Sequence, residues 1–307
     1  MLQLLAIGEV MAEIRQARLS DHGTKTTSAS GFSINFAGDT FNTAIYCQRQ
    51  LGTSQTVGFV SRIGTDPLSD GLVAMAQSES LSCDYLARDS ARNIGIYSVA
   101  TDNQGERSFH YWRNQSAARG LFTAEETELF LPQASMIYLS GITLAILPPI
   151  ARERLFTLLA ERRAKGTKIA FDSNYRPSLW ESADVARAIM SQMWSLTDIG
   201  LPSLDDEMAL FGDKTEEDAI ARLSAQTFDR LTIKRGDRGP LSPHLAPADH
   251  PEFAPAKQVI DTTAAGDSFN GGYFAAYLQG HDEAACLLAG HNLAAKVVTM
   301  PGAIMPR

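Results

Sequence analysis

The residues best suited to chemistry lie in one short segment, Asp261-Thr-Thr-Ala-Ala-Gly-Asp267. It follows strand-like residues 258–260 and leads into apolar residues at helical spacing, so a helix is expected to begin at residues 264–266. Small residues there let a ligand approach the backbone, and the free N–H groups of a helix start bind anions. Asp267 then suits a general base beside amides that stabilise a transferring phosphoryl group. The alternative is an ordinary helix cap, which leaves Asp261 and the run of small residues unexplained.

A second group of polar residues, Asp172-Ser-Asn-Tyr-Arg176, follows a buried strand. This group is expected at the carboxyl edge of a sheet, where α/β proteins bind ligands. Arg113, in Tyr111-Trp-Arg113, is another candidate for the same pocket. Two arginines in an acidic protein indicate an anionic substrate, because a guanidinium binds carboxylates through a planar fork. The alternative is that each arginine is an ordinary surface charge.

Short apolar runs alternate with helical segments along the chain. The pattern predicts strands at residues 4–8, 56–60, 136–140, 168–172 and 230–234. It predicts helices at residues 38–51, 68–79, 150–165, 183–194, 216–224 and 267–279. Such alternation predicts a largely parallel sheet with helices on both faces.

Two polar, strand-like stretches, residues 11–36 and 94–113, are not followed by helices. Residues 94–100 alternate with a period of two, a turn is expected at 102–105, and residues 108–113 read as a return strand. Together the two stretches would form a small separate sheet against one edge of the main sheet. The alternative is two ordinary surface hairpins.

Composition limits the possible partners. The 307 residues carry a net charge of −8, which argues against nucleic acid and anionic membranes because both require a basic surface. Three widely spaced cysteines favour a reduced, cytoplasmic location, and no signal peptide or membrane-helix pattern is present. The sequence also lacks a zinc pattern and both common phosphate-binding glycine motifs, so a nucleotide would bind in another way.

Two segments resemble the signatures of the ribokinase-like (PfkB) carbohydrate kinase family. Residues 261–272 resemble its C-terminal signature, and Ala37-Gly-Asp-Thr-Phe-Asn-Thr-Ala44 resembles its N-terminal signature, with Ala37 in place of the usual first glycine. The resemblance covers essentially the whole chain. It implies one ribokinase-like α/β domain over residues 1–307, with a mostly parallel central sheet, helices on both faces, and a small β-sheet lid built from residues 11–36 and 94–113.

The resemblance implies roles for residues near both signatures. Asp267 would be the general base, with the amides of Ala264, Ala265 and Gly266 stabilising the transferring group. Three residues match contacts to substrate hydroxyls: Gly38, Asp39 and Asn42. Read without the resemblance, Asp and Asn beside a glycine are just as often turn formers.

The resemblance further implies ATP and Mg²⁺ as cofactors. The matching nucleotide-binding residues are Asn174, Lys234, Gly236, Gly239 and Asn292. The alternatives are a basic turn around Lys234 and an exposed position for Asn292 in a helix over residues 284–299. Glu207 is expected to organise Mg²⁺ through water, although Ser203 stands where the family usually has Asn.

One subgroup of the family, the 2-keto-3-deoxygluconate kinases, shows the closest likeness. Its sugar-acid contacts match four residues here: Tyr97, Tyr111, Arg113 and Arg176. The expected reaction is ATP-dependent phosphorylation of the small sugar acid 2-keto-3-deoxy-D-gluconate to the 6-phosphate. The alternatives are a kinase of a neutral sugar (fructose, ribose) or of a nucleoside, and a non-catalytic sugar sensor on the same fold. Exposed strand edges in the lid leave room for a homo-oligomer.

Overall fold

The apolar runs of the sequence build a central seven-stranded sheet. In the computed structural model, which describes residues 2–16, 31–101, 107–123 and 131–307, the strand order is β11-β10-β9-β8-β1-β4-β5. Neighbouring strands pair in parallel, as expected. The bounds are β1 (Leu2–Ile7), β4 (Thr56–Ile63), β5 (Leu86–Arg88), β8 (Ala134–Ser140), β9 (Lys168–Asp172), β10 (Ile199–Gly200) and β11 (Arg230–Leu231).

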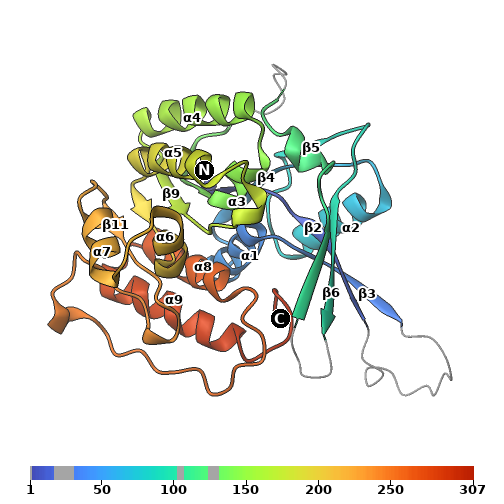
Figure 1. Ribbon diagram of the computed structural model, residues 1–307. Coiled ribbons are helices and arrows are strands. Elements are labelled where there is room, and N and C mark those ends of the chain that lie inside the picture. Colours follow the sequence, from blue (N-terminus) through green and yellow to red (C-terminus); the bar gives the residue numbers. More distant parts are fainter. Residues whose placement is uncertain (1, 17–30, 102–106, 124–130) are drawn as a thin grey trace.

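Both faces of this sheet are covered by helices, because successive side chains of a strand point to opposite sides. Leu5 and Ile7 of β1 pack into one hydrophobic cluster, and Leu4 and Ala6 pack into the other. The first cluster lies under α3 (Gly141–Ile146), α4 (Pro149–Ala164), α5 (Ala183–Leu196), α6 (Leu204–Phe211) and α7 (Glu216–Ser224). The second lies under α1 (Asp39–Leu51), α2 (Pro67–Ser78), α8 (Ala265–Leu278) and α9 (Glu283–Val297). Figure 1 shows α4 and α5 on one side of the sheet and α1, α8 and α9 on the other.

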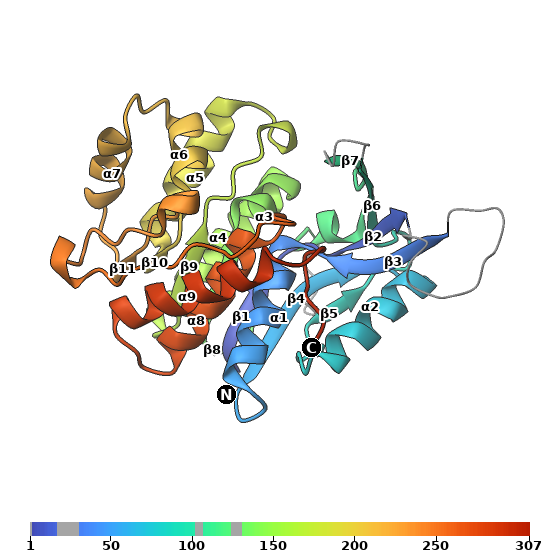
Figure 2. The ribbon, with the colours of Figure 1, turned by 90° about the horizontal axis from the view of Figure 1, so that it is seen from below.

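A second, four-stranded sheet stands beside the first (Figures 1 and 2). Its order is β3-β2-β6-β7, with bounds β2 (Met11–Gln16), β3 (Phe32–Ala37), β6 (Gly95–Thr101) and β7 (Arg107–Trp112). Strands β2 and β6 pair in parallel and the outer pairs are antiparallel, so the two stretches form one mixed sheet rather than two independent hairpins. The turn expected at residues 102–105 lies outside the described residues, as do residues 17–30.

The small sheet rests on the start of α8. Met11, Ala37, Tyr97 and Val99 form an apolar cluster with Ala264 and Ala303. This cluster fixes the small sheet over the carboxyl edge of the main sheet. The side chains that point inward from it therefore face the Asp261–Asp267 segment.

Several short elements differ from the sequence expectation. The strand expected at residues 258–260 is absent, and the N–H groups of Ile260 and Asp261 instead donate to the carbonyl of Val298, at 2.8 and 3.1 Å. The strand expected at residues 230–234 is limited to β11. The sequence pattern does not predict short elements such as β5, β10, α3 and α6, because a period cannot be recognised over so few residues. Among the helices of the described ranges, none is long and apolar enough to cross a membrane.

Candidate active site

A cavity of about 260 Å³ lies between the carboxyl edge of the main sheet and the small sheet. It gathers residues from both signatures and from the small sheet. The expected site residues that line it are Gly38, Asp39, Asn42, Tyr97, Tyr111, Arg113, Asn174, Arg176, Lys234, Gly266 and Asp267. The fold therefore brings together residues that are more than 200 positions apart in the chain.

Asp267 is the third residue of α8 and is buried. The cap position belongs to Ala264, which makes no side-chain cap hydrogen bond, so the interpretation of Asp267 as an ordinary cap is wrong. Its Oδ2 instead accepts a 2.8 Å hydrogen bond from Asn42 Nδ2. Burial, together with the negative charge of Asp39, raises the pKa of Asp267 from 3.8 to about 8. A carboxylate with a raised pKa in a cavity is a candidate for proton transfer.

The backbone around Gly266 is open to a ligand. A side chain placed there would meet only the Lys234 ammonium, at 3.6 Å. First-turn amides of an α-helix have no acceptor in a preceding turn, so Gly266 offers a free donor. Ala265 differs from expectation because its N–H donates to the Thr262 carbonyl at 3.1 Å. Ala264 packs against the small sheet, and Thr262 and Thr263 line the cavity where Ala264 and Ala265 were expected.

Asp261 acts as a structural anchor of this loop. It accepts hydrogen bonds from Thr263 N at 3.0 Å and Thr263 Oγ1 at 2.6 Å. It also accepts from Gly302 N at 2.6 Å, which ties the loop to the C-terminal tail. Arg15 Nη1, from β2, lies 3.7 Å from Asp261 Oδ2 and connects the loop to the small sheet.

Lys234 belongs to a buried polar network under the loop. Its ammonium donates to Asp172 Oδ2 and, at 3.3 Å, to Asn270 Oδ1. Asn270 Nδ2 donates to the same Asp172 oxygen at 2.7 Å. Asp172 ends β9 and lines the cavity, so the polar group that begins with it does lie at the carboxyl edge; its pairing with Lys234 and Asn270 could not be predicted from the sequence. The network presents a positive charge beside Gly266, which suits a phosphate group.

The two glycines after Lys234 shape a tight turn at Gly236–Arg238. Gly236 and Gly239 have φ of 62° and 77°, in the left-handed region that favours glycine. This geometry explains both glycines by backbone conformation.

Asn174 also adopts a positive φ, 31°, which is uncommon for a residue with a side chain. Its Nδ2 donates a 2.7 Å hydrogen bond to Asp39 Oδ2, and its backbone N donates to Asp172 Oδ1 at 3.1 Å. Asn174 thereby orients Asp39, the residue expected to contact substrate hydroxyls. Gly38 caps α1 at a point where any side chain would lie 2.1 Å from the Glu9 carbonyl oxygen, so only glycine fits.

Three aromatic rings of the small sheet face the cavity. Tyr97 and Tyr111 stack with centroids 5.8 Å apart, and Phe109 stacks on Tyr111 at 6.4 Å. The Tyr97 hydroxyl donates to Glu13, and burial raises the pKa of Tyr97. Aromatic faces of this kind cover the apolar side of a sugar-sized ligand.

Both expected arginines reach the cavity, and each has a carboxylate partner. Arg113 is buried and donates to Glu9, which also accepts from Ser116. Arg176 lies 3.4 Å from Asp206 and half of its side chain is exposed. An exposed pair at this distance contributes little, so Arg176 is the freer of the two.

Glu207, which was expected to organise Mg²⁺ through water, does not line the cavity. Its side chain is fully buried in the core and forms an ion pair with Arg222 at 3.0 Å. Burial raises the pKa of Glu207 to about 7. Neighbouring residues on a helix point about 100° apart, and the preceding residue Asp206 instead contacts the segment after β9, where it accepts from Tyr175 N at 3.1 Å.

Asn292 lies apart from the other expected residues. It is exposed on α9 and lines a separate hollow formed with the ends of α1 and α8. This placement matches the alternative given for Asn292, an exposed position on a helix. Asn292 therefore does not join the cavity in this structure.

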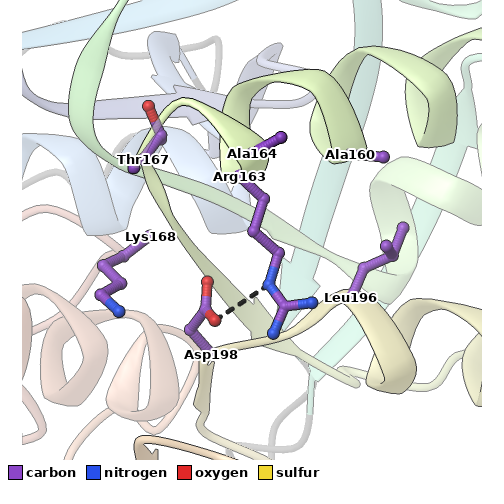
Figure 3. Close-up of a pocket in the computed structure, with 8 residues that line it drawn as sticks. Ala160, Arg163, Ala164, Thr167, Lys168, Leu196 and Asp198 are labelled. Carbon is purple, nitrogen blue, oxygen red and sulfur yellow. Dashed lines mark hydrogen bonds and ion pairs between the residues drawn. The ribbon is translucent and has the colours of Figure 1, made fainter.

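A third hollow lies at the opposite edge of the sheet, beside the start of β9 (Figure 3). Arg163 and Asp198 face each other across it and form an ion pair at 3.0 Å. Lys168 forms an ion pair with Asp229, with 2.6 Å between Lys168 Nζ and Asp229 Oδ2. Each of these charged side chains is therefore neutralised by a partner.

Comparison with solved structures supports the same architecture. A PfkB protein from Polaromonas sp. JS666 superposes with a TM-score of 0.80 at 25% identity, covering 99% of this chain and 97% of that one. A putative ribokinase II from E. coli, in complex with ATP and Mg²⁺, gives a TM-score of 0.82 at 22% identity, covering 99% and 95%. The second similarity concerns the fold alone.

Sequence comparison identifies the family. The 2-dehydro-3-deoxygluconokinase of Escherichia coli K12 is 39% identical over 312 residues, covering 99% of this chain and 97% of that protein. The 2-dehydro-3-deoxygluconokinase of Dickeya dadantii is 38% identical over 307 residues, covering 98% and 96%. The family model described as pfkB family carbohydrate kinase matches residues 1–307, and the chain therefore belongs to this family.

Proposed function

We propose that the protein phosphorylates the 6-hydroxyl of 2-keto-3-deoxy-D-gluconate (2-dehydro-3-deoxy-D-gluconate), with ATP as the phosphoryl donor. The observation that carries the proposal is the joint presence of Asp267, Arg113 and Arg176 in one cavity. A base beside a helix start serves phosphoryl transfer, and two arginines serve a carboxylate. The names of the relatives from E. coli and Dickeya dadantii support the same substrate.

Asp267 takes the proton from the acceptor hydroxyl in this proposal. Asn42 holds its carboxylate through the 2.8 Å hydrogen bond, and Asp39 orients a neighbouring hydroxyl of the sugar. The Gly266 amide and the Lys234 ammonium stabilise the negative charge that develops on the transferred group. Arg113 and Arg176 bind the carboxylate at the other end of the substrate.

Mg·ATP, when bound, supplies the γ-phosphoryl group. Lys234, Gly236 and Gly239 would hold its phosphates and the adjoining nucleotide. Asp206, which pairs with the cavity residue Arg176, is proposed to organise Mg²⁺ through water in place of Glu207. The residues fit such a cofactor, since the open backbone N–H at Gly266 and the Lys234 ammonium can donate hydrogen bonds to phosphate oxygens. Within the described ranges, no group of three or more His, Cys, Asp or Glu side chains could hold a metal ion by itself.

The small sheet serves as a lid in this proposal. It would belong to a single domain that spans residues 1–307, with residues 11–36 and 94–113 closing over the sugar. The apolar cluster around Ala264 keeps it docked on the phosphoryl-binding loop. A closed lid excludes water and thereby limits hydrolysis of ATP.

A coupled ADP-release assay with sugars and sugar acids tests this function. We expect turnover with 2-keto-3-deoxy acids only, and Arg113→Ala or Arg176→Ala to raise KM for the acid by about 10- to 100-fold, the effect of losing a charged hydrogen bond. Unchanged KM in both variants, with turnover of fructose, ribose or a nucleoside, would instead establish a neutral-substrate kinase. Sugar binding without any turnover would establish a sensor.

A second copy of the chain is proposed as a partner at the outer face of the lid. Ile14, Ile34, Ile96 and Trp112 share that face by register, and Ile34 and Trp112 are 52% and 62% exposed. Exposed apolar surface of this kind marks an interaction site. Analytical ultracentrifugation of Trp112→Ser should show a weaker assembly than the unmodified chain, whereas a monomer in both cases would reject the partner.

A cytoplasmic location is proposed on the three unbridged cysteines.

A further inference from the structure

Glu9 and Arg113 form a buried ion pair at the junction between the main sheet and the lid. Glu9 lies between β1 and β2, and Arg113 follows β7 directly. Both residues line the cavity, and their exposed fractions are only 3% and 7%. The second Glu9 oxygen accepts a hydrogen bond from Ser116, so the carboxylate is held at both ends.

The backbone at this junction is built around the Glu9 carboxylate. A side chain at Gly95, the first residue of β6, would lie 2.9 Å from Glu9 Oε1 and 3.4 Å from Arg113 Cβ. Only glycine fits there without a shift. Three segments at the junction of the two sheets, which contain Glu9, Gly95 and Arg113, therefore meet at the Glu9 carboxylate. The position of this carboxylate is tightly fixed.

The Arg113 guanidinium is only partly satisfied. One terminal nitrogen donates to Glu9, while Nε is buried and has no hydrogen-bond partner among the described residues. A buried donor without a partner is costly, so the Arg113 guanidinium has more donors than the protein supplies acceptors for. A carboxylate is the natural acceptor, because it can bind the planar fork of a guanidinium.

We infer that Glu9 is a positioning residue that sets the selectivity of the site for a substrate carboxylate; this rests on the proposed function. It fixes the orientation of Arg113, so that the remaining donors face a ligand in one geometry. It also offsets the charge of Arg113 in the empty site, where an unpaired buried cation would be destabilising. Arg113 is therefore already paired with one negative charge when the substrate carboxylate binds. The charge of Glu9 lowers the affinity of the site for that carboxylate.

Glu9 would act both through its charge and through the orientation of Arg113, and one substitution tests each effect. Glu9→Gln keeps an oxygen acceptor for Arg113 but removes the negative charge. We expect KM for 2-keto-3-deoxy-D-gluconate to fall by about tenfold, from the loss of one nearby repulsive charge. KM for the neutral carboxamide analogue should stay within about twofold. Ser116→Ala keeps the charge but removes one support of the carboxylate, and KM for the acid should rise several-fold.

A matched control comes from a similar cluster far from the cavity. Glu283 is also 3% exposed and accepts from Arg230 at 3.0 Å, Thr232 at 2.7 Å and Tyr273 at 2.7 Å. Glu283→Gln should leave the acid-to-carboxamide ratio of KM unchanged, even if it lowers thermal stability. A shift of that ratio in Glu283→Gln equal to the shift in Glu9→Gln would overturn the inference.

The same measurements distinguish failure of the role proposed for Glu9 from failure of the proposed function. If the unmodified enzyme does not prefer the acid over the carboxamide, and Arg113→Ala does not change KM, the proposed function fails. If the enzyme prefers the acid but Glu9→Gln and Ser116→Ala keep the original ratio, only the role of Glu9 fails. Should Glu9→Gln not fold, the Ser116→Ala result decides by itself.

Discussion

Asn42 and Asp267 are joined by a 2.8 Å hydrogen bond across 225 positions of the chain. The bond connects the first turns of α1 and α8, and Thr43 Oγ1 strengthens the contact by donating to the Asp267 carbonyl at 3.1 Å. Asn42 also accepts from Gly38 N at 3.4 Å, which fixes the direction of its amide. The amide therefore supports the charged form of Asp267 while burial opposes it.

The rate should depend on the protonation of Asp267. A base must be ionised, and the pKa of Asp267 is raised to about 8, mainly by burial and then by Asp39. We expect kcat/KM, which reports on the free enzyme, to rise with pH and level off above about 8. Asp39→Asn removes a negative charge that raises this pKa, so its curve should move to lower pH despite a lower maximal rate. A flat profile between pH 5 and 9 would speak against Asp267 as the base.

The protonation of Asp267 should also affect stability, but in the opposite direction: the rate requires the ionised form, and folding favours the protonated form. Between its ordinary pKa of 3.8 and about 8, Asp267 holds a proton in the folded state that it loses in the unfolded state. Its contribution to the free energy of unfolding is therefore present below pH 3.8 and is lost as pH rises through 8. Asp267→Asn should lose about 1,000-fold in kcat, yet gain stability over the unmodified protein as pH rises. Urea unfolding at pH 5 and pH 8.5 measures the difference, and an equal difference at both pH values would contradict a raised pKa.

The adjacent carboxylates Asp206 and Glu207 should separate metal binding from stability. Asp206→Asn is expected to increase the Mg²⁺ concentration for half-maximal activity by about tenfold, while changing stability little. Glu207→Ala should lower the free energy of unfolding by about 3 kcal/mol, because it breaks a buried ion pair, with no change in the Mg²⁺ requirement. Activity titrations with Mg²⁺ and urea unfolding of both variants check this assignment. The reverse pattern would restore Glu207 as the metal residue.

Arg15 should control how well the lid protects the phosphoryl-binding loop. It bridges Glu13 in the lid and Asp261 in the loop, at 3.7 Å from the latter. Arg15→Met should loosen the lid and raise ATP hydrolysis without sugar phosphorylation several-fold, because water then reaches the site. Arg15→Lys keeps a positive charge and should restore most of the coupling. The ratio of ADP released to sugar phosphate formed measures the effect, and a ratio of one in Arg15→Met would remove this role.

Much of the framework could be predicted from local patterns. The strands at residues 136–140 and 168–172 and the helix over residues 216–224 match the structure closely. Their apolar periods are long enough to stand out from the background. The loop before α8 was also predictable, because small residues followed by an aspartate have few structural explanations.

The residues and elements that the structure places differently from expectation share a physical origin. Glu207 and Asp206 are adjacent and chemically alike, and only the packing of α6 against α5 and α7 decides which one is buried. The sequence predicts a helix around Asn292 but not which way its side chain points. The rotation of α9 about its axis directs it to another hollow. The strand expected at residues 258–260 has an apolar pattern, yet Ile260 N pairs with the carbonyl of Val298 at the end of α9 instead.

The sequence by itself determined the family signatures, the alternation of strands and helices, and the type of chemistry that Asp267 can perform. These features depend on residues close together in the chain, where spacing and local conformation are linked. Only the tertiary structure decided which polar side chains meet: Glu9 with Arg113, Asp39 with Asn174, and Lys234 with Asp172. Such pairs lie far apart in sequence, and their partners, burial and pKa shifts arise only when the sheet edge, α8 and the lid come together.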